Sequence, residues 1–164
     1  MTPYQKWTAF YTMLRKDVVR IFRIWAQTFL PSVITSVLYF TIFGTVLGSR
    51  IGEMQGVNYM SFVVPGLVML AIVTSAYSNS SFTFFQSKFF MRSIDEMLVS
   101  PMPPWLIIAG FVAGGVIRGV LVGTLVMLVS LFFTGLHLAV FNLFIIFVFA
   151  IMTAIVFALA GLVN

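Results

Sequence analysis

The sequence predicts an all-α protein, a polytopic bundle of four transmembrane helices with an amphipathic helix before them. Hydrophobic residues make up 61% of the chain and charged residues only 8%, whereas a soluble domain of this length needs polar helix faces. Four apolar stretches also reach or exceed the roughly 20 residues that cross about 30 Å of hydrocarbon as an α-helix. They run over about 29–48, 57–77, 105–136 and 138–163. We therefore expect residues 1–164 to form one transmembrane domain.

Basic residues are placed unevenly along the chain, and this placement predicts the topology. Lys88 and Arg92 lie in the second polar break, whereas the first and third breaks carry only Arg50 and His137. Five more precede the first stretch: Lys6, Arg15, Lys16, Arg20 and Arg23. By the positive-inside rule both termini and the 82–104 segment are cytoplasmic. The net charge of +5 is then a topology signal and an attraction to anionic lipids, so no nucleic-acid partner is expected.

The first 27 residues are expected to form a cytoplasmic amphipathic helix, over about 4–25. Its apolar residues recur every three or four positions, and most of its bases lie away from them. The apolar face consists of Trp7, Phe10, Leu14, Val18, Phe22 and Trp25. Such a helix lies in the inner membrane interface. It serves either as a simple anchor or also as a contact for a cytoplasmic partner.

The first two spans each contain a proline. Pro31 lies near the start of the first span, where a missing amide is tolerated, and Pro65-Gly66 predicts a kink in the second. The second span ends in a polar run of Thr74, Ser75, Ser78, Asn79, Ser80 and Ser81. These side chains either form hydrogen bonds between helices or line a wet cavity.

The 82–104 segment combines large apolar side chains with charges, which a simple connector does not need. We therefore expect it to lie on the membrane surface or to insert into a groove of another protein. Three prolines at 101, 103 and 104 end any helix there.

The third stretch contains rows of small residues and one charge. Glycines spaced by four residues let helix backbones approach closely. The rows are Gly110 with Gly114, and Gly115 with Gly119 and Gly123. Arg118 lies among them, and a charge within a span is a candidate functional site. The alternatives for Arg118 are a structural role, by snorkelling to headgroups or by pairing, and a role in a transport path.

Catalytic chemistry is missing from the sequence. No phosphate-binding loop is present, because no glycine precedes any of the lysines. One histidine, no cysteine and four scattered acids make no convincing metal centre. The chain is therefore not expected to be an enzyme or to bind a cofactor. If the protein moves a substrate uphill, the energy must come from another chain.

Several parts of the chain together resemble the membrane subunits of bacterial type-2 ABC exporters. The resemblance rests on the order of a basic amphipathic helix, a first span holding Pro31, a Val64-Pro65-Gly66 step, and the stretch Ile94 to Pro103 followed by the glycine rows and Arg118. It covers essentially the whole chain. It implies a multi-pass permease of the bacterial inner membrane that forms a homodimer and pairs with ATPase subunits, on which ATP is bound.

In that family the loop between spans two and three docks on the ATPase. The resemblance therefore implies a coupling loop here, made of Phe89, Phe90, Arg92, Asp95, Glu96, Met97, Leu98, Ser100 and Pro101. Family permeases usually have six spans, so these four spans are expected to be an incomplete permease domain. The alternative function is an ATP-independent small membrane protein, either an assembly factor or an oligomeric pore.

Overall fold

The computed structural model describes residues 2–47, 53–54, 57–91, 93–134 and 140–163, and most of them are helical. The elements are α1 (Pro3–Arg23), α2 (Trp25–Thr41), the π-helical η1 (Ile42–Leu47), β1 (Glu53–Met54), β2 (Val57–Asn58), α4 (Tyr59–Phe85), the π-helical η2 (Gln86–Phe90), α5 (Ser93–Val99), α6 (Pro104–Thr134) and α7 (Val140–Val163). Four segments are long and apolar enough to cross a membrane: Trp25–Gly44, Phe62–Phe90, Pro104–Phe132 and Ile145–Val163. The predicted class, an all-α transmembrane bundle, is confirmed.

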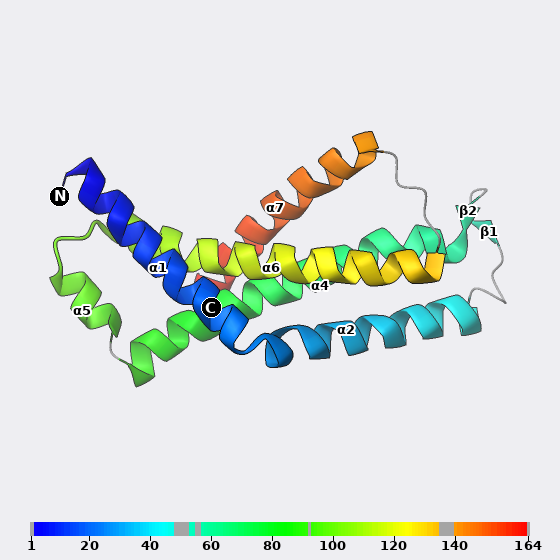
Figure 1. The fold of residues 1–164 in the computed structure, drawn as a ribbon, viewed down its shortest axis with the longest axis horizontal. Helices are drawn as coiled ribbons and strands as arrows, with labels where there is room; N and C mark the ends of the chain where they lie inside the picture. The colour runs from blue at the N-terminus through cyan, green and yellow to red at the C-terminus, as the bar shows by residue number, and fades with distance from the viewer. Residues whose placement is uncertain (1, 48–52, 55–56, 92, 135–139, 164) are drawn as a thin grey trace.

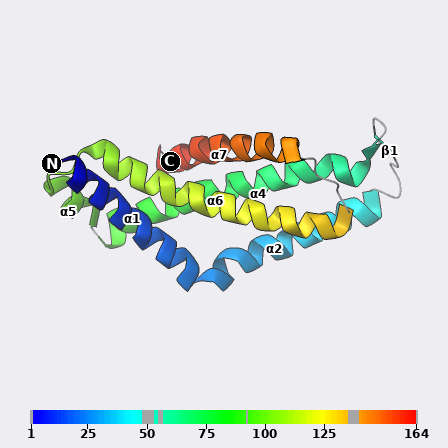
Figure 2. The ribbon, with the colours of Figure 1, turned by 45° about the horizontal axis from the view of Figure 1, so that its top comes forward.

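Helix α4 lies at the centre of the bundle and packs against both α6 and α7. Helices α1 and α5 lie at one end, and the hairpin of β1 and β2 lies at the other (Figure 1). Figure 2 shows α1 running beside α6 and meeting α2 at an angle. The amphipathic helix is therefore packed on the bundle as well as next to the first span.

The core of the bundle is built from small and β-branched side chains. On α7, Ala150, Ala154 and Ala158 recur every four residues, which places them on one helix face. On α4, the buried positions from Val64 to Ala76 keep the same spacing. Small residues on facing helices let the backbones approach closely, which is how helices associate in lipid.

The first glycine row of α6 faces the amphipathic helix. A Cβ added at Gly110 would clash with Met13, and one added at Gly114 would clash with the carboxylate of Asp17. These two glycines therefore let α1 lie directly on the backbone of α6.

The second glycine row faces α4. A Cβ at Gly119 would lie 3.0 Å from the Cβ of Ala76 and 3.2 Å from the carbonyl oxygen of Ile72. A Cβ at Gly123 would strike the Ile72 side chain, and one at Gly115 would lie 3.0 Å from the Ala76 carbonyl oxygen. Two adjacent rows on one helix thus contact two different partners.

Two predicted boundaries differ from the structure. Helix α4 continues to Phe85 and then into η2, so the polar break starts near residue 91 rather than at 82. The residues from Ser81 to Phe90 include no glycine or proline that would end the helix. The sequence predicts that Val57 opens the second span, but it pairs with Met54 in a two-residue hairpin, as β-branched residues favour.

Candidate functional site

A polar cluster joins α1, α4 and α6 near the point where α1 meets α2. Arg20 of α1 donates hydrogen bonds to Asn79 Oδ1 at 3.3 Å and to Thr83 Oγ1 at 2.5 Å, both on α4. Arg118 of α6 donates from Nη1 to the same Asn79 oxygen, at 3.2 Å. Asp17 completes the cluster, 3.5 Å from Arg20. One amide oxygen therefore accepts from two guanidinium groups on two different helices.

The cluster carries more positive than negative charge. Asn79 is only 2% exposed and Asp17 only 5%, so both lie inside the packed helices. Burial raises the pKa of the Asp17 carboxyl above its ordinary value, although Arg20 and Lys16 pull it down. Among the described residues, Asn79 Nδ2 and Arg118 Nε have no hydrogen-bond partner. Neutral Asn79 is thus the acceptor that holds two cations at one point.

Arg118 has two interpretations, a structural role and a role in a transport path, and its position in the bundle is relevant to both. Its guanidinium reaches α4 and shares an acceptor with Arg20, four residues before the Ile24 junction between α1 and α2. Arg118 therefore has a pairing partner on a neighbouring helix. The polar run on α4 also has partners on other helices, since Ser80 Oγ donates to the Phe111 carbonyl oxygen at 3.5 Å. Thr74, in contrast, donates to its own helix, to the Leu70 carbonyl oxygen at 2.8 Å.

Sequence reasoning identified Arg118 and Asn79 but missed their partners. Arg20 is used only as a basic residue in the topology argument, and neither Asp17 nor Thr83 is named as a candidate. One signal could have pointed to them. Asp17 is the only acid before the first span, and it lies three residues from Arg20 on one helix face.

The predicted coupling loop lies at the end of the molecule that holds α1 and α5. Helix α5 is anchored by Ile94, which is buried against Ile107 and Phe111. Met97 is a predicted docking residue, but it is half-buried and packs against this same apolar cluster. Ser100 is half-buried too and donates to the Met97 carbonyl oxygen at 2.6 Å. Exposed side chains are Phe89, Phe90, Asp95, Glu96, Leu98 and Pro101. Arg92 lies outside the described residues.

Side chains that could bind a metal ion are scattered over the described residues. Over those residues, no group of three or more His, Cys, Asp and Glu side chains comes together to hold a metal ion.

Residues 8–164 match the family described as ABC-2 type transporter, which is nearly the whole chain. The chain belongs to the ABC-2 type transporter family. It is 49% identical over 160 residues to the inner membrane transport permease YadH of Escherichia coli strain K12, and equally to the proteins of that name from E. coli O157:H7 and Shigella flexneri. The alignments cover 96% of this chain and 60% of each relative, so the chain spans about 60% of the length of these relatives. No solved structure matches the chain.

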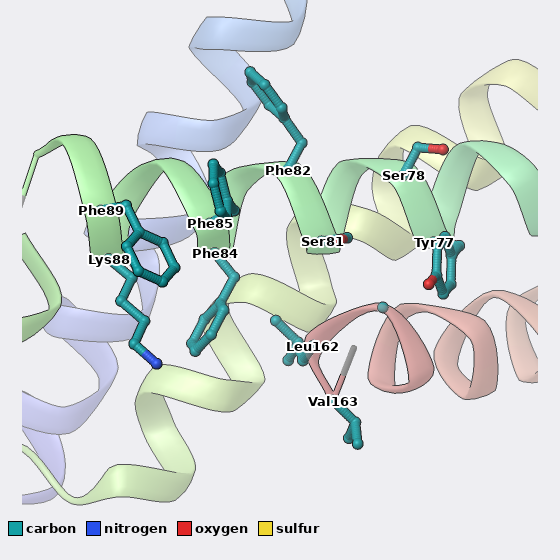
Figure 3. Close-up of a pocket in the computed structure, with 11 residues that line it drawn as sticks. Tyr77, Ser78, Ser81, Phe82, Phe84, Phe85, Lys88, Phe89, Leu162 and Val163 are labelled. Carbon is teal, nitrogen blue, oxygen red and sulfur yellow. The ribbon is translucent and has the colours of Figure 1, made fainter.

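This ABC-2 chain has a hollow of about 820 Å³ between α4, η2 and the end of α7 (Figure 3). Lys88 and Phe84 line it from one side, and Leu162 and Val163 line it from α7. A second groove of about 510 Å³ shares these four residues and continues between α5 and α6. Both hollows lie on the α5 side of the molecule, next to the exposed residues of the predicted coupling loop.

Proposed function

We propose that this chain is part of a permease subunit of an ATP-binding-cassette exporter in the bacterial inner membrane. It forms part of the translocation path and couples to a separate ATPase subunit. Family membership, the four membrane-crossing segments and the printed name of the relatives support this proposal. ATP is bound and hydrolysed on the partner, because this sequence has no phosphate-binding loop. A second copy of the permease completes the transporter.

Helix α5 is the feature that supports the coupling role most directly. Ile94 fixes one face of it on α6, so the helix has a defined position. Val99, away from Ile94, is 89% exposed, and Leu98, on the same face as Ile94, is exposed as well. Phe90, just before the helix, is 76% exposed. Exposed apolar side chains beside Glu96 have the composition of a contact surface for another protein.

The test removes one apolar anchor and reverses one charge. The Phe90→Ala/Glu96→Lys double variant should reduce co-purification of the ATPase subunit with the permease in detergent. Loss of an aromatic anchor typically costs about 2 kcal/mol or more, which is roughly a 30-fold loss of affinity.

The matched control is Phe132→Ala/Glu53→Lys, at the opposite end of the molecule. Phe132 is 93% exposed, so its truncation also removes an unpacked aromatic ring. The control should co-purify the ATPase as the unmodified protein does. Undiminished co-purification by the Phe90→Ala/Glu96→Lys variant would contradict the coupling role and leave the ATP-independent alternative.

A further inference from the structure

The groove beside α5 has the shape and chemistry of a lipid site. Its walls come from five elements, α4, η2, α5, α6 and α7, and its volume of about 510 Å³ lies within the ~300–1,000 Å³ range of small-molecule sites. The apolar lining consists of Phe84, Ile94, Leu98, Ile107, Ile108, Phe111, Leu159, Leu162 and Val163. An apolar groove of this volume can hold a hydrocarbon chain.

Lys88 is the cationic side chain that lines this groove. The Lys88 amine lies 5.9 Å from the Phe84 ring centre and 5.5 Å from that of Phe89, so two aromatic faces hold it in place. Asp95 lines the same groove from α5. Among the described residues, however, no carboxylate lies within 4.0 Å of Lys88. Figure 3 shows the Lys88 side chain extending beside Phe84, with Leu162 on the other side of the Phe84 ring.

The groove also lies at a depth that suits a headgroup. Trp105 follows Pro104, which lines the groove, and Trp105 is exposed at the start of α6. Trp side chains are enriched at the membrane–water interface. Lys88 belongs to the same end of the molecule, which the basic residues place on the cytoplasmic side, where anionic lipids attract Lys and Arg.

We propose that this groove binds one anionic phospholipid, with its phosphate on Lys88 and one acyl chain between α5, α6 and α7. Lys88 supplies the positive charge for the phosphate, although the Asp95 carboxylate lines the groove too. The apolar walls favour a lipid over a protein segment, which needs partners for its backbone groups. The lipid fills the space between the coupling helix and the end of α7. Its binding does not depend on the ATPase.

The test uses the intact protein, purified and delipidated in detergent. Native mass spectrometry then counts the lipids retained from micelles that contain phosphatidylglycerol or phosphatidylcholine. The protein should retain more phosphatidylglycerol than phosphatidylcholine. Lys88→Gln should weaken its binding about tenfold, because a charge-assisted hydrogen bond is lost. The control Lys6→Gln makes the same change of net charge on α1 and should leave binding unchanged.

A second pair of variants tests the acyl-chain part without a change of charge. Leu159→Trp fills the groove from an exposed position on α7 and should also reduce retention. Leu128→Trp, exposed elsewhere on α6, should not. Equal retention by Lys88→Gln and Lys6→Gln would overturn the proposal, and so would full retention by Leu159→Trp. Failure of the intact protein to retain any phosphatidylglycerol would show that something else covers the groove, and would overturn it as well.

Discussion

At the scale of single residues, Asn79 is the point on which the polar cluster depends. Its side-chain oxygen is the shared acceptor for Arg20 and Arg118, and it is neutral. A neutral amide oxygen satisfies the hydrogen bonds of the two arginines, but it does not neutralise their positive charges. The arrangement therefore predicts opposite effects for two substitutions at one position.

Asn79→Leu should lower the thermal stability of the protein in detergent, whereas Asn79→Asp should keep or raise it. Leucine removes the shared acceptor of two half-buried guanidinium groups. Arg20 keeps Thr83 and Asp17, so the loss falls mainly on Arg118, at about 1–3 kcal/mol for an unsatisfied group. Aspartate keeps an acceptor and adds a charge-assisted bond to each arginine. Melting temperatures measure both, and Thr74→Leu, on an exposed position of α4, serves as the control. A lower melting temperature for Asn79→Asp than for Asn79→Leu would contradict this account.

Asp17 predicts a dependence of stability on pH. Because burial raises its pKa in the folded state, the folded protein holds a proton over a pH window in which the unfolded chain has lost it. The contribution of Asp17 to stability therefore falls as pH rises from the ordinary carboxyl pKa through the raised one. Melting temperatures of the unmodified protein and Asp17→Asn should diverge over this window, and the variant should be the more stable of the two at the higher pH. Parallel curves would show that Arg20 fully offsets the burial.

The residue scale also shows where prediction from sequence stops. Arg118 and Asn79 could be named because a charge and an amide are unusual within apolar runs. Their contact with Arg20 could not, since Arg20 and Asn79 are 59 residues apart and meet only when α1 packs on the bundle. The spacing of the apolar residues predicts the apolar face of α1. It does not predict that the buried Asp17 lies on the face that contacts α6. Local patterns carry no information about which face meets which helix.

At the scale of elements, α6 is the helix that joins the others. One of its glycine rows packs against α1 and the other packs against α4. The spacing of the glycines could be read from the sequence, and it predicts close packing in general. The identity of the two partners follows from the turn of about 100° between adjacent helix positions, which aims Gly114 and Gly115 in different directions.

Gly115→Ala should destabilise the bundle, and Gly66→Ala should not. A Cβ at position 115 would clash with the Ser80 hydroxyl and would lie 3.0 Å from the Ala76 carbonyl oxygen and 3.1 Å from the Ala158 Cβ. The last two atoms cannot rotate away. Overpacking of this kind costs about 1–3 kcal/mol. At Gly66 no atom lies within 4 Å of an added Cβ, and alanine favours a helix by about 0.5–1 kcal/mol. Thermal melting in detergent compares the two, and an equal loss at both positions would refute close packing at Gly115.

Element boundaries are harder to predict than element existence. The four spans could be found because the bilayer demands long, internally bonded helices. The sequence places the end of α4 too early, because a run of serines resembles a loop in composition. Within a helix, however, serine and threonine can bond to their own backbone, as Thr74 does, or to a neighbouring helix, as Ser80 does.

At the scale of the whole molecule, the orientation in the membrane follows from the distribution of charge. Val99→Cys and Glu53→Cys place single thiols at the two ends of a chain that has no cysteine of its own. In intact cells an impermeant thiol reagent should label the cysteine at position 53 and not the one at 99. Disrupted cells should show labelling at both positions. The reverse pattern in intact cells would invert the topology and remove α5 from the side where an ATPase resides.

The unbroken helical course from Tyr59 to Phe90 has a mechanical consequence. At about 1.5 Å per residue, this helix is roughly 48 Å long and exceeds the ~30 Å hydrocarbon layer. Within these described residues Pro65 lies inside the helix, between the hairpin at one end and η2 at the other. Arg20 and Arg118 both bond to the helix at Asn79. A displacement of the η2 end would therefore not stay local, because α4 packs against both α6 and α7 and would move these helices with it.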